Sequence, residues 1–428
     1  MKLFIALLLN ALLLVGLAGW LRAEYRRAAP SLRRWLLPAL ALRLGTGLLP
    51  HGPDSRYMSF WGQALTAQFW ARPRAAWALW QGHEIHAGAQ VLDSYQWSNT
   101  LFTIKILGLL NLASLSSEWL NSMYLSLFCL AGCWVLVRTL ARLFPAAPVG
   151  AGVLAFLLWP SVVWWASGIT KEALLLGSGA ALTALFLNEL YGSPLGDWWA
   201  RLGSWLLLGL LAWLHLRLRY FFALPLLGCL LALAGTTLAT RRGWLPAGWR
   251  WQLLVLLGGA GLAGLLVVLV GGEPVSKVFV TSQLWQNYLH GLATSAGRPH
   301  LVYAGLEPTL GSMAQYFPLA AFQALAQPWL GESAAPLYVV AGIENLLLIG
   351  LLAVAGWRVA RGRPGHLPAG LVLALLLYSV VLAGLIGLST PNLGTLHRYR
   401  AVLLPWLLWL LLQSDYARRL LRRLGLAG

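Results

Sequence analysis

The sequence predicts an all-α membrane protein that crosses the bilayer about eleven times, on the basis of composition and of the pattern of apolar runs. Of the 428 residues, 59% are hydrophobic and 10% are charged, and the mean hydropathy is +0.69, which excludes an ordinary soluble domain. Apolar runs close to the length of a bilayer span recur from end to end. We therefore expect one integral membrane domain over residues 1–428.

The predicted spans are separated by short loops, except at two places. They cover residues 3–20, 35–49, 120–137, 149–166, 172–190, 202–215, 221–238, 251–270, 337–357, 367–388 and 401–412. The long segments 51–117 and 271–335 are expected to lie outside the membrane on one face. Within the first, residues 57–70 carry an apolar stripe at helical spacing, which predicts a helix on the membrane surface. Residues 101–112, which include Lys105, are too short to span and are expected to be interfacial or re-entrant.

The formal charge of +18 comes from arginines in short clusters between apolar runs. This pattern orients a membrane protein and does not indicate a nucleic-acid partner. With the N-terminus outside, the predicted cytoplasmic segments hold 18 basic and four acidic residues, against 12 basic and eight acidic in the outer segments. All four lysines and most acidic residues then lie outside, so we expect the functional site on that face, in contact with membrane lipids.

One acidic residue stands out in the first outer segment. Residues 49–57 read Leu-Pro-His-Gly-Pro-Asp-Ser-Arg-Tyr, which places Asp54 where the membrane surface meets water. A carboxylate at this boundary is costly to desolvate, which makes it a functional candidate. The alternative, of equal weight from this stretch alone, is a turn in which Asp54 caps the following helix.

Three further outer clusters combine charge with proximity to a span. Lys171-Glu172 and Arg217-Leu218-Arg219 lie at membrane boundaries, where ion pairing and snorkelling are the structural alternatives. The third, His397-Arg398-Tyr399-Arg400, places arginines against the positive-inside rule and is the strongest phosphate candidate. On a regular helix Arg398 and Arg400 point apart, whereas an extended segment allows both to reach one phosphate.

A weak metal signal is present at His83 and His86. Two histidines three residues apart, without a third ligand nearby, are more typical of a solvated loop. We expect no metal site there.

The motifs Pro-Asp-Ser-Arg-Tyr at 53–57 and Trp-Ala-Ser-Gly-Ile-Thr-Lys-Glu at 165–172 resemble the GT-C glycosyltransferases. This clan includes the protein mannosyltransferases and the aminoarabinose transferases, which use polyprenyl-phosphate-linked sugars. The resemblance extends over about the first 220 residues and includes the surface helices of the first outer segment. Two features depart from the clan: Asp54 has no second acid beside it, and an extra span precedes the segment.

This resemblance implies a GT-C-like fold and transfer of a sugar from a polyprenyl-phosphate carrier to an acceptor on the periplasmic face of a bacterial inner membrane. Asp54 matches the catalytic acid of the first outer loop. The leaving phosphate needs cations, for which the candidates are Arg398, Arg400, His397, Lys171 and Lys105, and the candidates for other substrate contacts are Tyr57, His51, Glu172 and Arg219. Whether a divalent metal is required stays open.

Two other classes of function remain. A polysaccharide polymerase or ligase of the O-antigen type places its site in 271–335, with His290, Arg298 and His300, and makes Asp54 dispensable. A non-catalytic transporter of a lipid-linked substrate predicts charges within the spans on both halves of the membrane, but Arg43 and Glu344 are the only clear intramembrane charges in the sequence, and no inverted repeat is evident. The glycosyltransferase ranks first and the transporter last.

Overall fold

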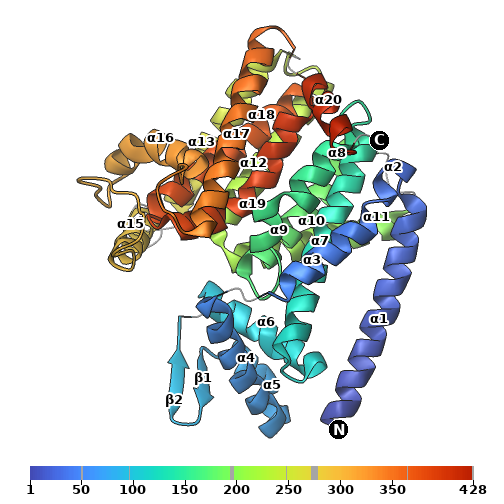
Figure 1. The fold of residues 1–428 in the computed structure, drawn as a ribbon, viewed down its shortest axis with the longest axis vertical. Coiled ribbons are helices and arrows are strands. Elements are labelled where there is room, and N and C mark those ends of the chain that lie inside the picture. The colour runs from blue at the N-terminus through green and yellow to red at the C-terminus, as the bar shows by residue number, and fades with distance from the viewer. Residues whose placement is uncertain are drawn as a thin grey trace.

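The computed structural model describes residues 1–49, 52–95, 97–192, 197–246, 248–270, 278–363 and 365–426, and it is a helical bundle with one short β-hairpin (Figure 1). In the described part, seven helices are long and apolar enough to cross a membrane, which confirms a polytopic helical membrane protein. They are α1 (Lys2–Arg27), α7 (Glu118–Leu143), α10 (Lys171–Tyr191), α11 (Trp198–Leu218), α12 (Tyr220–Arg241), α17 (Pro336–Ala360) and α18 (Ala369–Ser389). Two further long helices, α13 (Trp249–Val270) and α19 (Leu393–Leu412), coincide with the predicted spans 251–270 and 401–412.

Helix α10 lies in the core of the bundle and α1 at its edge. In the most apolar 18-residue stretch of α10, 72% of the residues are buried. The corresponding share in α1 is 6%, and most of its leucines face outward. Helices α7 and α10 approach closely because Gly132 faces Gly177: a Cβ atom on Gly132 would lie 2.1 Å from the carbonyl oxygen of Gly177. This contact requires glycine and brings the start of α10 into the centre of the molecule.

Two of the predicted spans are not single helices long enough to cross the membrane. The second is α3 (Leu36–Gly47), preceded by the short α2 (Pro30–Arg33). At 1.5 Å per residue its 12 residues extend about 18 Å, short of the roughly 30 Å hydrocarbon core, so α3 alone does not span. The fourth is broken into α8 (Val149–Gly152), the π-helical η2 (Val153–Leu158) and α9 (Pro160–Trp165), because Pro160 cannot donate a backbone hydrogen bond.

The segment 51–117 is mostly helical. It contains α4 (Pro53–Ala71), η1 (Pro73–Ala75), α5 (Ala76–Gln81) and α6 (Asn99–Ser114). The predicted helix at 57–70 is confirmed, although its buried stripe is Met58, Trp61, Leu65 and Phe69, and Tyr57 and Phe60 are exposed. It packs on α6, where the Thr66 hydroxyl donates to the carbonyl of Gly108 at 2.9 Å.

The stretch at 83–86, predicted as a solvated loop, is part of a hairpin. Strands β1 (Glu84–Ala87) and β2 (Gln90–Asp93) pair antiparallel, and Glu84 faces Asp93. The all-α class therefore has one small exception in the described part.

The predicted outer segment 271–335 contains α15 (Val278–Ala293) and α16 (Leu310–Ala326). Helix α16 packs tightly on α18: a Cβ atom on Gly387 would lie 2.2 Å from the carbonyl oxygen of Ala320. Much of this segment is therefore integrated into the bundle and is not a free loop.

The two ends of the bundle differ in charge. At one end Lys2 lies 5.6 Å from the ring centroid of Trp70 on α4, and α4, α5 and the hairpin extend beyond the bundle (Figure 1). At the other end lies the basic helix α20 (Asp415–Arg423), where Arg418 donates to the carbonyl of Ala146 at 2.7 Å. There Arg34 also donates to the carbonyl of Gly425 at 3.0 Å. We call these the cavity end and the arginine end.

Candidate functional site

Two adjoining cavities, of about 440 and 400 Å³, lie at the cavity end. Both are lined by Asp54, Lys171, His290 and Tyr399; the first adds Asn99 and Arg219, and the second adds Tyr57, Glu172 and Arg398. These side chains come from α4, α6, α10, α15, α19 and the junction of α11 and α12. Segments far apart in the chain thus supply a single charged site.

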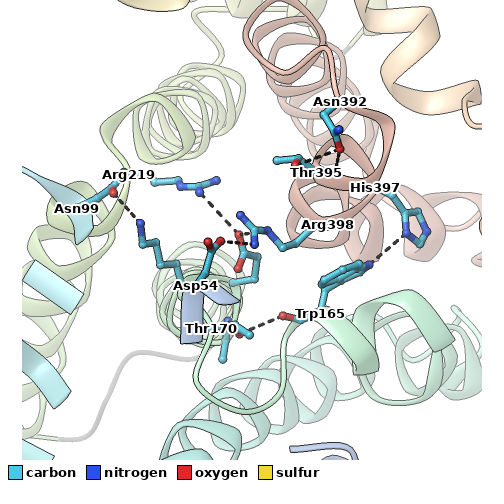
Figure 2. A network of polar contacts seen from close by, with 12 residues as sticks. Asp54, Asn99, Trp165, Thr170, Arg219, Asn392, Thr395, His397 and Arg398 are labelled. Carbon is cyan, nitrogen blue, oxygen red and sulfur yellow. Dashed lines mark hydrogen bonds and ion pairs between the residues drawn. The ribbon is translucent and has the colours of Figure 1, made fainter. Parts of the chain in front are cut away.

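Asp54 lies in the first turn of α4, where Gly52 is the N-cap and Pro53 the first helical residue. The alternative that Asp54 caps this helix is therefore wrong. Its carboxylate Oδ2 instead accepts a hydrogen bond from the guanidinium NH1 of Arg398 at 2.7 Å (Figure 2). Burial alone raises the pKa of Asp54, but the hydrogen bond and charge of Arg398, aided by the charges of Lys171 and Arg219, hold it below its ordinary value of 3.8. Asp54 is therefore a carboxylate at neutral pH.

Glu172 extends this ion pair into a chain of alternating charge. Its Oε1 lies 3.6 Å from Nε of Arg398 and 3.7 Å from NH2 of Arg219. Arg219 occupies the extended residue between α11 and α12, and its guanidinium lies 3.8 Å from the ring centroid of Tyr399. Glu172 and Arg219 are both buried, so each charge depends on the other for compensation.

Lys171 is held by a different set of partners. Its Nζ donates to Asn99 Oδ1 at 3.0 Å and to Thr100 Oγ1 at 2.6 Å, at the start of α6. These partners are neutral, so the ammonium keeps its charge available to an anion in the cavity. Thr170 precedes it as the N-cap of α10, accepting from the backbone N–H of Ala173 at 3.1 Å.

Six predicted residues therefore meet at this site: Asp54, Tyr57, Lys171, Glu172, Arg219 and Arg398. His51 lies outside the described residues. The remaining three, His397, Arg400 and Lys105, are not among the described residues that line the two cavities.

The separation of Arg398 from Arg400 follows from the helix. Helix α19 is regular from Leu393 onward, so an extended segment reaching Arg400 is ruled out and the two arginines diverge. Arg400 is 1% exposed and donates from NH1 to the carbonyls of Leu325 at 3.0 Å and Gln327 at 3.2 Å. Arg400 therefore donates to carbonyls at the C-terminus of α16 that lack a partner within the helix, and it does not face the cavities.

His397 and Lys105 also contact other parts of the bundle instead of the two cavities. His397 is buried behind Arg398, between Trp165 and Glu344. Lys105 lies further along α6, 6.0 Å from the ring centroid of Trp80. Burial, and secondarily the charge of Arg217, lowers its pKa.

Three site residues were missed as site residues by the sequence argument. Asn99 and Thr100 bind Lys171, and Tyr399 stacks on Arg219. The local signal for Asn99 and Thr100 was the N-cap Ser98, which predicts a helix start and says nothing about Lys171, 72 residues later than Asn99. Tyr399 stood inside the predicted cluster at 397–400 but was given no role. A fourth, His290, had been named only for the polymerase alternative.

The hairpin supplies a third potential ligand near the weak metal signal. The ligand atoms of His83, Glu84 and Asp93 lie within 4.8 Å of one another, because β2 brings Asp93 opposite Glu84. All three side chains are exposed, and His83 Nδ1 lies 3.0 Å from Asp93 Oδ1, which is a surface ion pair when the histidine is protonated. We assign no metal site to it.

Comparison of the chain with known protein families, curated proteins and solved structures finds no match.

Proposed function

We propose that this protein is a GT-C-type membrane glycosyltransferase that transfers a sugar from a polyprenyl-phosphate carrier to an acceptor on the outer face of a bacterial inner membrane. The observation that carries the proposal is the convergence of Asp54, Lys171, Glu172, Arg219 and Arg398 on one site. With Arg298, which also lines the larger cavity, four basic residues stand against two acidic ones, and this net positive charge complements the negative charge of a phosphodiester donor.

The geometry suggests a role for each side chain. Arg398 has Asp54 on one side and Glu172 on the other, so a donor phosphate that enters the site competes with Asp54 for the guanidinium. The released Asp54 carboxylate then accepts the proton of the acceptor hydroxyl, or stabilises its positive charge as it attacks the sugar. Arg398 and Lys171 stabilise the charge that develops on the leaving phosphate.

Eleven spans and an outward-facing cavity belong to the same proposal. Helices α13 and α19, of 22 and 20 residues, have the length of a span in addition to the seven helices above. Two more crossings then use α2 with α3, and α8 with η2 and α9. The excess of arginine at the opposite end supports the orientation.

A polysaccharide polymerase or ligase is the second candidate, because His290 and Arg298 line the larger cavity, as that class predicts. The transporter has less support. Both of its intramembrane charges, Arg43 and Glu344, bond to the backbone of the broken fourth span and are not among the described residues lining the two cavities.

The test is transfer from a purified polyprenyl-phosphate sugar by wild type, Asp54→Asn and the control Asp197→Asn. Asp197 caps α11 by accepting from the N–H of Ala200 at 2.8 Å, so the control applies the same substitution to a structural aspartate. We expect Asp54→Asn to lose about 100-fold or more of the transfer rate and Asp197→Asn to lose little. Full activity in Asp54→Asn, together with loss in His290→Ala and Arg298→Ala, would favour the polymerase or ligase.

A further inference from the structure

We infer that Arg43 and Glu344 are positioning residues that hold α9, the short helix after the break in the fourth span, and thereby set the place of Lys171 and Glu172. We call Arg43 and Glu344 the α9 anchors. The link to catalysis rests on the proposed function; the anchoring itself does not. Both side chains are buried, at 1% and 6% exposure, within predicted spans, where an ionised group is costly unless it is well bonded.

Arg43 supplies the donor that Pro160 removes. In a continuous α-helix the carbonyl of Phe156 would accept from the N–H of the residue four positions later, which here is Pro160. Arg43 NH2 donates to that carbonyl at 3.0 Å instead. Its NH1 also donates to the carbonyls of Val162 at 3.2 Å and Ala166 at 2.9 Å, so one guanidinium joins η2 to the C-terminal part of α9.

Glu344 binds the opposite end of α9. Its Oε1 accepts from the backbone N–H of Ser161 at 2.9 Å, in the first turn, where helix N–H groups have no intrahelical acceptor. A carboxylate is favourable at this end and a guanidinium at the other because of the helix dipole. The two charges therefore stabilise α9 from both ends without pairing with each other.

A second contact ties α9 to α19. The indole N–H of Trp165 can only donate, so Nδ1 of His397, 3.1 Å away, accepts. The ring proton then lies on Nε2 and points to Glu344 Oε2 at 3.4 Å. Figure 2 shows Trp165 pointing towards His397, the neighbour of Arg398 in sequence.

From α9 the chain enters the site within a few residues. The backbone N–H of Gly168 donates to Ser126 Oγ on α7 at 2.8 Å, and the hydroxyl of Thr170 donates to the carbonyl of Trp165 at 3.0 Å. Lys171 and Glu172 follow directly. Displacement of α9 therefore moves Glu172 relative to Arg398, which lies 3.6 Å away.

The first test is a double-mutant cycle on thermal stability between Arg43→Met and Pro160→Ala. Pro160→Ala restores the N–H that Phe156 lacks, so Arg43 has less to compensate in that background. We expect Arg43→Met to lower Tm, and the loss to be smaller when Pro160 is alanine, because the restored N–H replaces one of the three hydrogen bonds that Arg43 donates. Equal losses in both backgrounds would overturn the proposed replacement of the proline N–H.

The second test measures the position of the turn after α9 by thiol reactivity. Ser167 is 0% exposed and Ser167→Cys is close to isosteric, so N-ethylmaleimide should label it slowly in detergent. We expect Arg43→Met and Glu344→Gln each to speed labelling about tenfold, as read by mass spectrometry. Cys229, buried on α12, is the internal control for global unfolding.

Arg400→Met is the matched control for labelling, because Arg400 is equally buried and also donates to helix carbonyls, but those of α16. Labelling of Ser167→Cys should not change in that variant. The same rate in the anchor variants as in wild type, or an equal increase in the Arg400 variant, would overturn the anchoring role.

Transfer kinetics then test the link to catalysis. We expect Arg43→Met to raise KM for the donor and lower kcat, because both Lys171 and Glu172 are misplaced, and Arg43→Lys to give intermediate values because lysine keeps the charge without the planar fork. Faster labelling with unchanged kinetics would overturn the positioning role alone. Absence of transfer in wild type would contradict the proposed function and leave the cycle and the labelling to decide the anchoring.

Discussion

The cavity end and the arginine end both contain buried acidic residues, and the comparison shows what separates a site from a structural ion pair. At the arginine end Glu24 is buried, and its Oε2 accepts from Trp134 Nε1 at 3.0 Å and pairs with Arg138 Nε at 3.2 Å. At the cavity end Glu172 pairs only at 3.6–3.7 Å, with two arginines that lie beside open space. The first set is well bonded within the protein, whereas the second leaves charge for a ligand.

Orientation in the membrane requires only an excess of basic residues at one end, whereas the proposed sugar transfer requires opposite charges held close together. The arginine end meets the first condition with arginines on α20 and the short loops. The cavity end meets the second condition, because opposite charges contact one another in the order Asp54, Arg398, Glu172 and Arg219. Substitutions at one end should therefore leave the properties of the other end unchanged.

The largest expected effect is all-or-none and tests which end faces outward. Ala89 lies at the exposed hairpin turn of the cavity end and Ala29 in the exposed connection after α1. An impermeant thiol reagent applied from outside to cells should label Ala89→Cys and leave Ala29→Cys unlabelled. The reverse pattern would place the cavity in the cytoplasm and remove the argument for a periplasmic donor.

Within the cavity end, Arg398 and Arg400 should behave differently although they are two residues apart. Arg398→Ala removes a charge-assisted hydrogen bond worth about 1.5–3 kcal/mol, which is on the order of ten- to a hundredfold in transfer rate if it acts in the transition state. Arg398→Lys should recover part of that loss.

Arg400→Ala should instead lower thermal stability, because the carbonyls of Leu325 and Gln327 lose their donor. Donor titrations and melting curves on the same preparations separate the two outcomes. If Arg400→Ala lowered the transfer rate in donor titrations more than Arg398→Ala does, the phosphate would lie at Arg400 and not at Arg398.

At the arginine end, Glu24→Gln tests whether a buried acid there matters only for stability. The substitution keeps the shape but weakens the contacts to Trp134 and Arg138, so we expect the free energy of unfolding to fall by about 1–3 kcal/mol. The transfer rate per folded molecule should stay within about twofold. A large loss of transfer at full stability would show that the two ends are coupled.

The smallest expected effect is the pH dependence of the Asp54–Arg398 pair. Because the folded-state pKa of Asp54 lies below 3.8, the pair contributes its full stability above that value and loses it as pH falls through the folded pKa. Between about pH 5 and 8 the difference in Tm between wild type and Asp54→Asn should therefore be constant, and it should shrink only in more acidic buffer. A difference that changes near neutral pH would mean that another group titrates with the pair.

Several features of this protein follow from the sequence because they depend on local or additive properties. Hydropathy is additive along a run, so the helical membrane class and the positions of the long helices were predicted correctly. The apolar periodicity at 57–70 correctly predicted α4. The excess of basic residues at one end also appeared in the order of the loops, since successive loops alternate between the two faces of the membrane.

Only the tertiary structure decided which charges meet. Asp54 and Arg398 are 344 residues apart, and no local pattern states their 2.7 Å contact. Two residues apart on α19, Arg398 faces the cavity and Arg400 faces the end of α16. The surroundings of each arginine therefore depend on which element packs on its face of the helix. The sequence predicted a continuous span at 149–166, so it foresaw neither the break at Pro160 nor its compensation by Arg43, 113 residues from Phe156. Charge pairing depends on distances between separate helices, and those distances are set by packing of the whole bundle.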